Sequence, residues 1–235
     1  LVIALPARAD VPPVPAPLEE FAHYVMRENP SAQQAQQRAI AVNDAMGDVA
    51  HPAARALFPA MTEFLVGFAV LGNGHPERAR EHFRRAVSGA EAANRVEPSS
   101  EAYRLLADAH NQLLDTGSVS YKIFNAWRAR DAAERAVELD PANPLAHIAA
   151  ASYFVSAPGI AGGDHARGAR HIQQARELGG ESEYVRFLAD VWDGRLAAAR
   201  NRPEEAEAAF ARAHAVYPGN WWLEQIARTL RIPLP

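Results

Sequence analysis

The chain has 235 residues, with 24 basic and 28 acidic side chains and a formal net charge of −4 at pH 7. It is long enough to bury a sizeable core, and its content of 49% hydrophobic and 22% charged residues is that of an ordinary globular protein. The basic residues form no block along the chain, so we expect no nucleic-acid partner. The lack of cysteine excludes disulfides, thiolate metal sites and thiol nucleophiles.

The first residues, LVIALPARAD, join a short apolar run to a proline and to the small-x-small pattern Ala7-Arg8-Ala9. This pattern is typical of a signal-peptidase cleavage site. We therefore interpret residues 1–9 as the end of an export signal and expect a periplasmic location; the alternative is a disordered terminus or an expression scar. Residues 10–17 are rich in proline and are predicted to form an extended lead-in. We expect no membrane-spanning segment, because no other stretch holds the roughly 18 uncharged apolar residues required.

Residues 18–235 are predicted to form one all-α domain. Apolar residues recur at helical spacing from Leu18 onward, and nearly every break carries proline or glycine. No alternating pattern favours a strand. The sequence therefore predicts about ten helices.

Four segments share a helix face on which small residues flank a larger or central one at positions i, i+4 and i+7. Such a face lets a neighbouring helix approach closely. The four sets are Ala79, Phe83 and Ala86; Ala129, Ala133 and Ala136; Gly168, Ile172 and Ala175; and Ala206, Phe210 and Ala213.

These faces belong to a pattern that resembles the tetratricopeptide repeat (TPR). Gly67 and Gly194 each stand 12 residues before the first member of a set, and Asp140-Pro141 closes one repeat. The resemblance implies antiparallel helical hairpins stacked as a solenoid. Two insertions interrupt it, TGSVSYKIFN (116–125) and the extra residues in APGIAGG (157–163), and residues 220–230 are predicted to form a capping helix.

The glycine-rich stretch SAPGIAGGDHARGARHIQQA (156–175) could cradle a phosphate or could simply be the turn of a hairpin. No strand precedes it and no GKS or GKT follows, whereas Asp164 is placed to cap the next helix. We interpret it as a turn. Together with HIAAASYFVS (147–156), the stretch is similar to the T-component of TRAP-type solute transporters. That resemblance implies a periplasmic accessory component that binds an apolar or lipid-like molecule beside periplasmic or outer-membrane transport proteins.

No catalytic, cofactor or metal site is predicted. The nine histidines lack a helical i, i+4 pair, which a helical zinc site would use. The candidate carboxylates Asp108, Asp115, Asp190 and Asp193 have no catalytic motif around them. We therefore expect a protein that is not an enzyme.

Aromatic residues gather in the second to fourth repeats and in the insertions, where they could form plain core or a ligand pocket. The pocket hypothesis treats both insertions as lids over one apolar cavity. Two functions follow: a carrier of an apolar or lipid-like ligand, or a scaffold whose concave face binds a partner protein in an envelope complex. The cavity candidates are His110, Tyr121, Ile123, Phe124, His147, Tyr153, Phe154 and Ile160.

Overall fold

A computed structural model describes residues 11–235, apart from the side chain of Ile123. The predicted signal-peptide remnant, residues 1–9, lies outside this range. Within it the secondary structure is helical, without strands. The helices are α1 (Ala16–Glu28), α2 (Ala32–Met46), α3 (Pro52–Gly72), α4 (Pro76–Val96), α5 (Ser100–Thr116), α6 (Val119–Leu139), α7 (Pro144–Ser156), the 3-10 helix η1 (Gly159–Ala161), α8 (His165–Gly179), α9 (Glu183–Ala199), α10 (Pro203–Val216) and α11 (Trp221–Leu230).

Four antiparallel hairpins, α3–α4, α5–α6, α7–α8 and α9–α10, follow one another along the chain. The small-large-small faces predicted for the second helices are buried in α4, α6, α8 and α10. In the first and fourth hairpins the reason for the repeat glycine is visible. A Cβ on Gly67 would stand 2.8 Å from the ring of Phe83, and one on Gly194 would stand 2.3 Å from the ring of Phe210. The TPR-like architecture is confirmed.

The glycine-rich stretch between α7 and α8 is a tight turn. Asp164 caps α8 by accepting hydrogen bonds from the backbone N–H of Ala166 at 2.9 Å and of Arg167 at 3.0 Å. Gly162 has a φ of 88°, and a Cβ on Gly163 would stand 1.8 Å from the carbonyl oxygen of Ala157. The turn geometry alone therefore requires both glycines.

The two insertions differ from the loops that the sequence suggested. Most of TGSVSYKIFN belongs to α6, whose first turn is capped by the hydroxyl of Ser118. The insertion therefore lengthens the second helix of the hairpin and does not form a flexible lid. The extra residues before α8 include η1.

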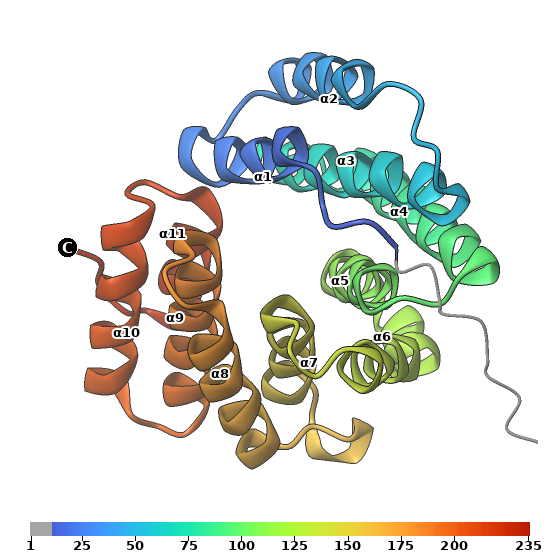
Figure 1. Ribbon diagram of the computed structural model, residues 1–235. Helices are drawn as coiled ribbons and strands as arrows, with labels where there is room; N and C mark the ends of the chain where they lie inside the picture. The colour runs from blue at the N-terminus through green and yellow to red at the C-terminus, as the bar shows by residue number, and fades with distance from the viewer. Residues whose placement is uncertain (1–10) are drawn as a thin grey trace, which may run out of the picture.

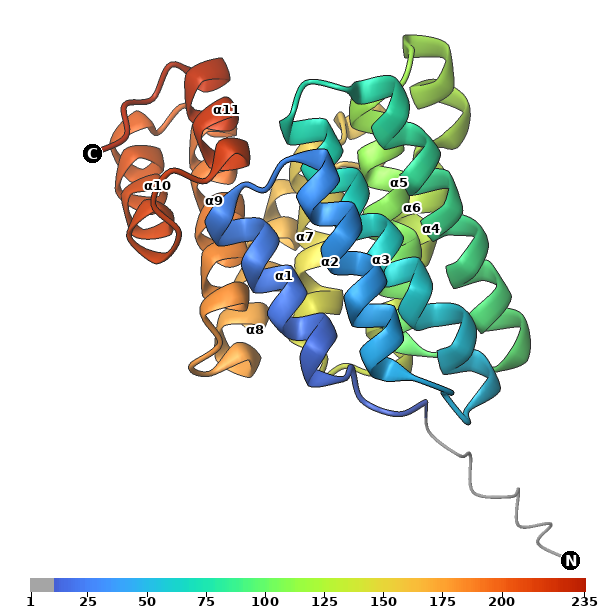
Figure 2. The ribbon, with the colours of Figure 1, turned by 90° about the horizontal axis from the view of Figure 1, so that it is seen from above.

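The ends of the solenoid meet. Figures 1 and 2 show α1 lying beside the C-terminal helices. The buried side chain of Asn220 donates to the carbonyl of Met26 at 2.7 Å, and the ring of Trp221 lies 4.8 Å from that of Phe68. The predicted capping helix α11 thus also contacts α3, and its N-cap Asn220 accepts from the N–H of Leu223.

Two further segments lie against the body of the domain. The lead-in ends at Pro15, and Val11 and Val14 pack on the core, so this stretch is more than a tether. Helix α3 is the one described helix long and apolar enough to cross a bilayer, but 72% of its most apolar window is buried inside the fold. Burial by neighbouring helices accounts for its composition without a membrane.

Candidate functional site: the central cavity

Two adjoining cavities lie among the inner helices of the solenoid. Cavity A has a volume of about 210 Å³ and cavity B of about 470 Å³. The first helices of the hairpins, α3, α5, α7 and α9, contribute side chains to both cavities. Helix α1 also lines both cavities, and α11 lines cavity A. The two cavities share the side chains of Phe64, Arg104, Leu145 and Tyr184.

One wall of cavity A is aromatic. The ring of Trp222 in α11 lies 5.9 Å from that of Phe68 in α3 and 6.0 Å from that of Trp192 in α9. These edge-on arrangements favour a fixed surface, because aromatic rings attract each other edge to face. The wall therefore depends on closure of the solenoid, which brings α11 next to α3. The aromatic residues that line cavity A are Phe64, Phe68, Tyr153, Tyr184, Trp192 and Trp222.

A polar stripe from α5 also lines cavity A. Its members recur with a helical period, so they share one face of the helix. Arg104 is the first residue of the stripe along the chain. It donates to Asp108 Oδ2 at 2.6 Å and, through Nε, to Glu101 Oε1 at 2.8 Å. The stripe comprises Arg104, Asp108, Asn111, Gln112 and Asp115.

Burial changes the acid–base behaviour of the stripe. Burial raises the pKa of Asp108 to about 6, and Glu101 contributes in the same direction, while Arg104 opposes the rise. Desolvation by the surrounding helices also raises the pKa of Asp115, although this residue keeps contact with solvent and Arg195 and Lys122 offset part of the effect. Burial lowers the pKa of Arg104, but the two neighbouring carboxylates outweigh it, so the net shift is upward. Arg104 stays charged, whereas Asp108 can exchange a proton in mildly acidic solution.

Of the residues predicted for the pocket, Tyr153 lines cavity A. Its hydroxyl donates to the carbonyl of Ala161, which fixes η1 to α7. Phe154 is buried between two other groups: its ring stacks on that of His171 at 5.7 Å, and the guanidinium of Arg167 lies 3.9 Å from its centroid. Phe154 is therefore core of the α7–α8 hairpin, as the alternative interpretation of the aromatic residues allowed.

The two histidines proposed as polar contacts for a ligand are buried elsewhere. His147 Nδ1 lies 2.9 Å from Nδ1 of His171, and its Nε2 lies 3.0 Å from the carbonyl oxygen of Pro141. His110 is buried, and its Nδ1 has no hydrogen-bond partner among the described residues. Burial, with a contribution from Arg128, lowers the pKa of His110 to about 4. Neither side chain lines cavity A or cavity B.

Both insertions contribute to the wall of cavity A, through Lys122 in the first and Ala157, Pro158 and Ala161 in the second, but two of the large apolar side chains predicted for the pocket do not line it. Phe124 is 74% exposed and Ile160 is 99% exposed, so the structure does not bring them to the expected pocket. The cause is the helical form of the first insertion, which turns one face of α6 outward. Tyr121 packs on the core beside Gly117, and Ile123 lies outside the described side chains.

Sequence reasoning missed several lining residues, among them Arg104, Trp192 and Trp222. The polar stripe of α5 has a detectable signal, because charged and amide residues recur at helical spacing on a helix whose other faces are apolar. Asp108 and Asp115 were considered only as catalytic groups. In the described part of the chain, no group of three histidine, aspartate or glutamate side chains is placed to hold a metal ion.

No protein-family model matches this chain, and no curated protein matches it significantly. Its fold is similar to that of a thermophilic TPR protein from Thermus thermophilus, with a TM-score of 0.51, 15% sequence identity, and coverage of 92% of this chain and 97% of that one. The pilF protein of Pseudomonas aeruginosa aligns over 91% of this chain and 96% of its own, with 14% identity and a TM-score of 0.35. The first similarity supports the TPR-like fold; the T-component resemblance stays a prediction.

Proposed function

We propose that this protein is a TPR-like interaction module that binds the end or the tip of an extended segment of a partner protein in cavity A. The observation that carries the proposal is that aromatic side chains and the polar stripe of α5 line the same cavity. A peptide offers both apolar side chains and backbone amides. The aromatic residues can contact the apolar side chains of the peptide, and the polar stripe can form hydrogen bonds with its backbone amides.

The charged stripe argues against a purely apolar cargo. A lipid chain in cavity A would lie against Arg104 and Asp108. It would displace water from these charged side chains without replacing the hydrogen bonds that water makes with them. Amides such as Asn111 and Gln112 can instead donate to and accept from a peptide backbone. We therefore favour the scaffold function over the apolar carrier.

The closed form of the solenoid limits how a peptide can enter cavity A. In an open solenoid an extended peptide can lie across the concave face. Here Asn220 and Trp221 of the C-terminal region contact α1 and α3, so the two ends of the solenoid are joined. A chain end or a loop tip can enter cavity A from one mouth, whereas a continuous strand would have to be threaded through it.

The proposed role is binding, not catalysis. The buried Arg104 is occupied by two carboxylates, which fixes it as part of the wall. The export pattern at residues 7–9 and the T-component resemblance motivate a narrower version, in which the partner is a transport protein of the envelope and the module is periplasmic. Cell fractionation of the full-length protein tests that location.

The main experiment blocks the mouth of cavity A. Ser156, an exposed residue at the end of α7, lines it, while Ser120 is exposed on α6 and does not. We would select peptides from a random phage-displayed library on the full chain and measure their affinity by fluorescence polarisation. Ser156→Trp should abolish binding and the matched control Ser120→Trp should preserve it.

Two results would overturn the proposal. Selected peptides that bind the Ser156→Trp variant as tightly as the parent would place their site elsewhere. A failure to select peptides, together with a small molecule retained in native mass spectra of the parent and lost in Ser156→Trp, would assign cavity A to a small-molecule carrier. The aromatic lining of cavity A makes the carrier the second candidate.

A further inference from the structure

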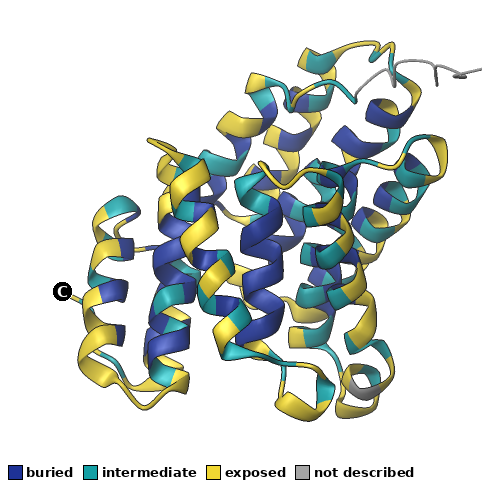
Figure 3. Cartoon of the chain, turned by 60° about the horizontal axis from the view of Figure 1, so that its bottom comes forward, coloured by how far each residue is buried: buried dark blue, intermediate teal, exposed yellow. Residues whose placement is uncertain are grey.

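One end of the molecule presents large apolar side chains to solvent from two different elements. On α6, Val119 is 74%, Phe124 74% and Trp127 51% exposed, and on η1 Ile160 is 99% exposed. The two elements contact each other, and Figure 3 shows α6 and the η1 turn projecting together at the bottom of that view. We call these four residues the apolar tip.

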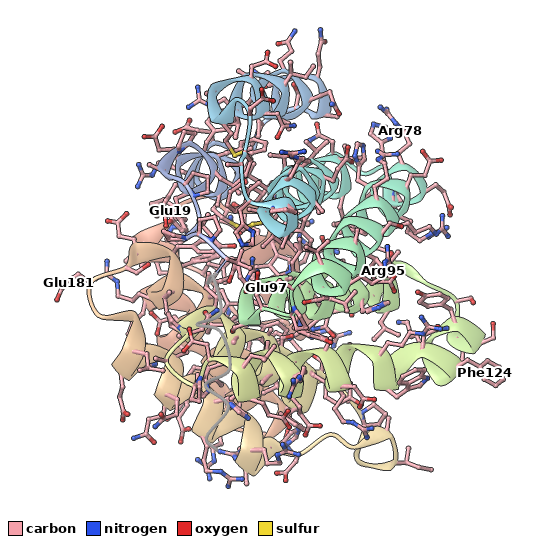
Figure 4. All side chains as sticks on the ribbon, turned by 45° about the vertical axis from the view of Figure 1, so that its right-hand side comes forward. Glu19, Arg78, Arg95, Glu97, Phe124 and Glu181 are labelled. Carbon is pink, nitrogen blue, oxygen red and sulfur yellow. The ribbon has the colours of Figure 1, made fainter. Side chains whose placement is uncertain are left out.

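Packing within the chain does not account for the apolar tip. The opposite side of the same helix faces inward, where Lys122 and Ala126 line cavity A. Phe124 and Trp127 lie on the side turned away, and Figure 4 shows Phe124 at the outer edge of the molecule. Leaving several large apolar side chains together in water is unfavourable, and such clusters on a surface mark contact with another apolar phase.

We propose that the apolar tip docks this protein on an anionic lipid surface. The tip is convex: a projecting helix and a turn that stand out from the body of the domain. A soft interface accepts such projections directly, while a protein partner would need a matching hollow. Tryptophan and phenylalanine beside basic residues are the composition that interfacial segments use.

The polar groups at the tip are compatible with this surface. The indole N–H of Trp127 already donates to the carbonyl of Phe124 at 3.0 Å, so the ring can enter an apolar layer without leaving a donor unpaired. The guanidinium of Arg128 lies 5.2 Å from the Trp127 ring centroid. The nearby carboxylates Asp131 and Glu134 on the same helix pair with Arg130.

The distribution of charge also favours one orientation of the protein on an anionic membrane. The protein carries a net charge of −4, which an anionic membrane repels as a whole. At the tip, however, Arg128 is exposed and its guanidinium lies on the ring of Trp127. Anionic lipids attract juxtaposed basic side chains over about a Debye length. Attraction is therefore local to the tip.

The test is sedimentation of the full chain with lipid vesicles. Phosphatidylcholine vesicles containing about one third phosphatidylglycerol should bind the protein, pure phosphatidylcholine vesicles should bind it less, and salt should weaken binding. The double variant Phe124→Ser/Trp127→Ser should lower the partition coefficient about tenfold or more. The matched control Ile40→Ser removes an apolar residue that is 54% exposed on α2 and should change nothing.

Thermal unfolding of each variant would confirm that the fold is intact, which the exposure of the substituted residues leads us to expect. A parent protein that does not sediment with anionic vesicles would overturn the proposal. So would equal binding by the parent and the double variant. If light scattering shows a dimeric parent and a monomeric double variant, with no vesicle binding by either, the tip is an interface between two copies of this chain.

Discussion

Gly194→Ala tests the close helix contact on which the fourth hairpin depends. Gly194 in α9 faces Phe210 in α10, and an added Cβ would stand 2.3 Å from Cε1 and 2.4 Å from Cδ1 of that ring. Ordinary van der Waals contact begins near 3.4 Å. Because Phe210 is fully buried, its ring cannot swing into solvent, and the two helices must move apart by about 1 Å or the ring must leave its preferred rotamer.

Two opposing contributions set the size of the effect. Replacing glycine by alanine inside a helix stabilises it by about 0.5 to 1 kcal/mol when space is free. Overpacking a closed core costs about 1 to 3 kcal/mol, so packing exceeds helix propensity here. The net loss should be about 1 to 2 kcal/mol, which lowers the Tm of a domain of this size by about 2 to 8 °C.

The measurement is urea and thermal unfolding followed by circular dichroism. Gly159→Ala is the matched control, since a Cβ there meets nothing within 4 Å, and it should leave the Tm almost unchanged. Adding Phe210→Leu to Gly194→Ala should recover part of the loss, as the two sites are coupled. If Gly194→Ala is as stable as the parent, the tight approach of α9 and α10 is not a source of packing strain and the reasoning fails.

Three further predictions concern pH and the closed solenoid. Burial lowers the pKa of His110 from 6.5 to about 4, so stability should rise with pH between these values, and His110→Gln should flatten that rise in urea unfolding. Asp108 affects stability in the opposite direction. Its pKa is raised from 3.8 to about 6, so its contribution to the free energy of unfolding should fall as the pH rises between these values. Asp108→Asn should remove that pH dependence in the same assay. Deleting residues 220–235 should accelerate amide exchange in α1 as well as in α9, because Asn220 binds the Met26 carbonyl; unchanged exchange in α1 would show that the closure is not cooperative.

The hairpins were predictable because the signals for them are local. Small residues at i, i+4 and i+7, helix caps such as Asp164 and turn glycines act within a few residues of chain, so they can be read without knowing what lies across the molecule. The glycines that the TPR pattern requires, Gly67 and Gly194, contact the aromatic residues of the second helices in the structure. The repeat spacing therefore encoded a real steric constraint.

The pocket was less predictable because an aromatic residue has the same sequence signature in a core, in a cavity wall or on a surface. Phe154 is core, Tyr153 lines cavity A and Phe124 is exposed, although all three lie in helices, Phe124 in α6 and the other two in α7. Whether an aromatic residue lies in the core, in a cavity wall or on the surface depends on the helices packed around it, which come from distant parts of the chain. The sequence of an insertion also gives no sign of whether it forms a lid or lengthens a helix.

By itself the sequence determined the helical class, the four hairpins, their turns and the capping helix at residues 221–230, since these follow from short-range periodicity and capping. Only the tertiary structure decided that the solenoid closes on itself. Closure rests on contacts between residues nearly the whole chain apart, such as His23 Nδ1 with the Tyr217 hydroxyl at 2.6 Å. Those contacts depend on the summed twist of successive hairpins, which no single segment encodes, and they create the cavity that the proposed function requires.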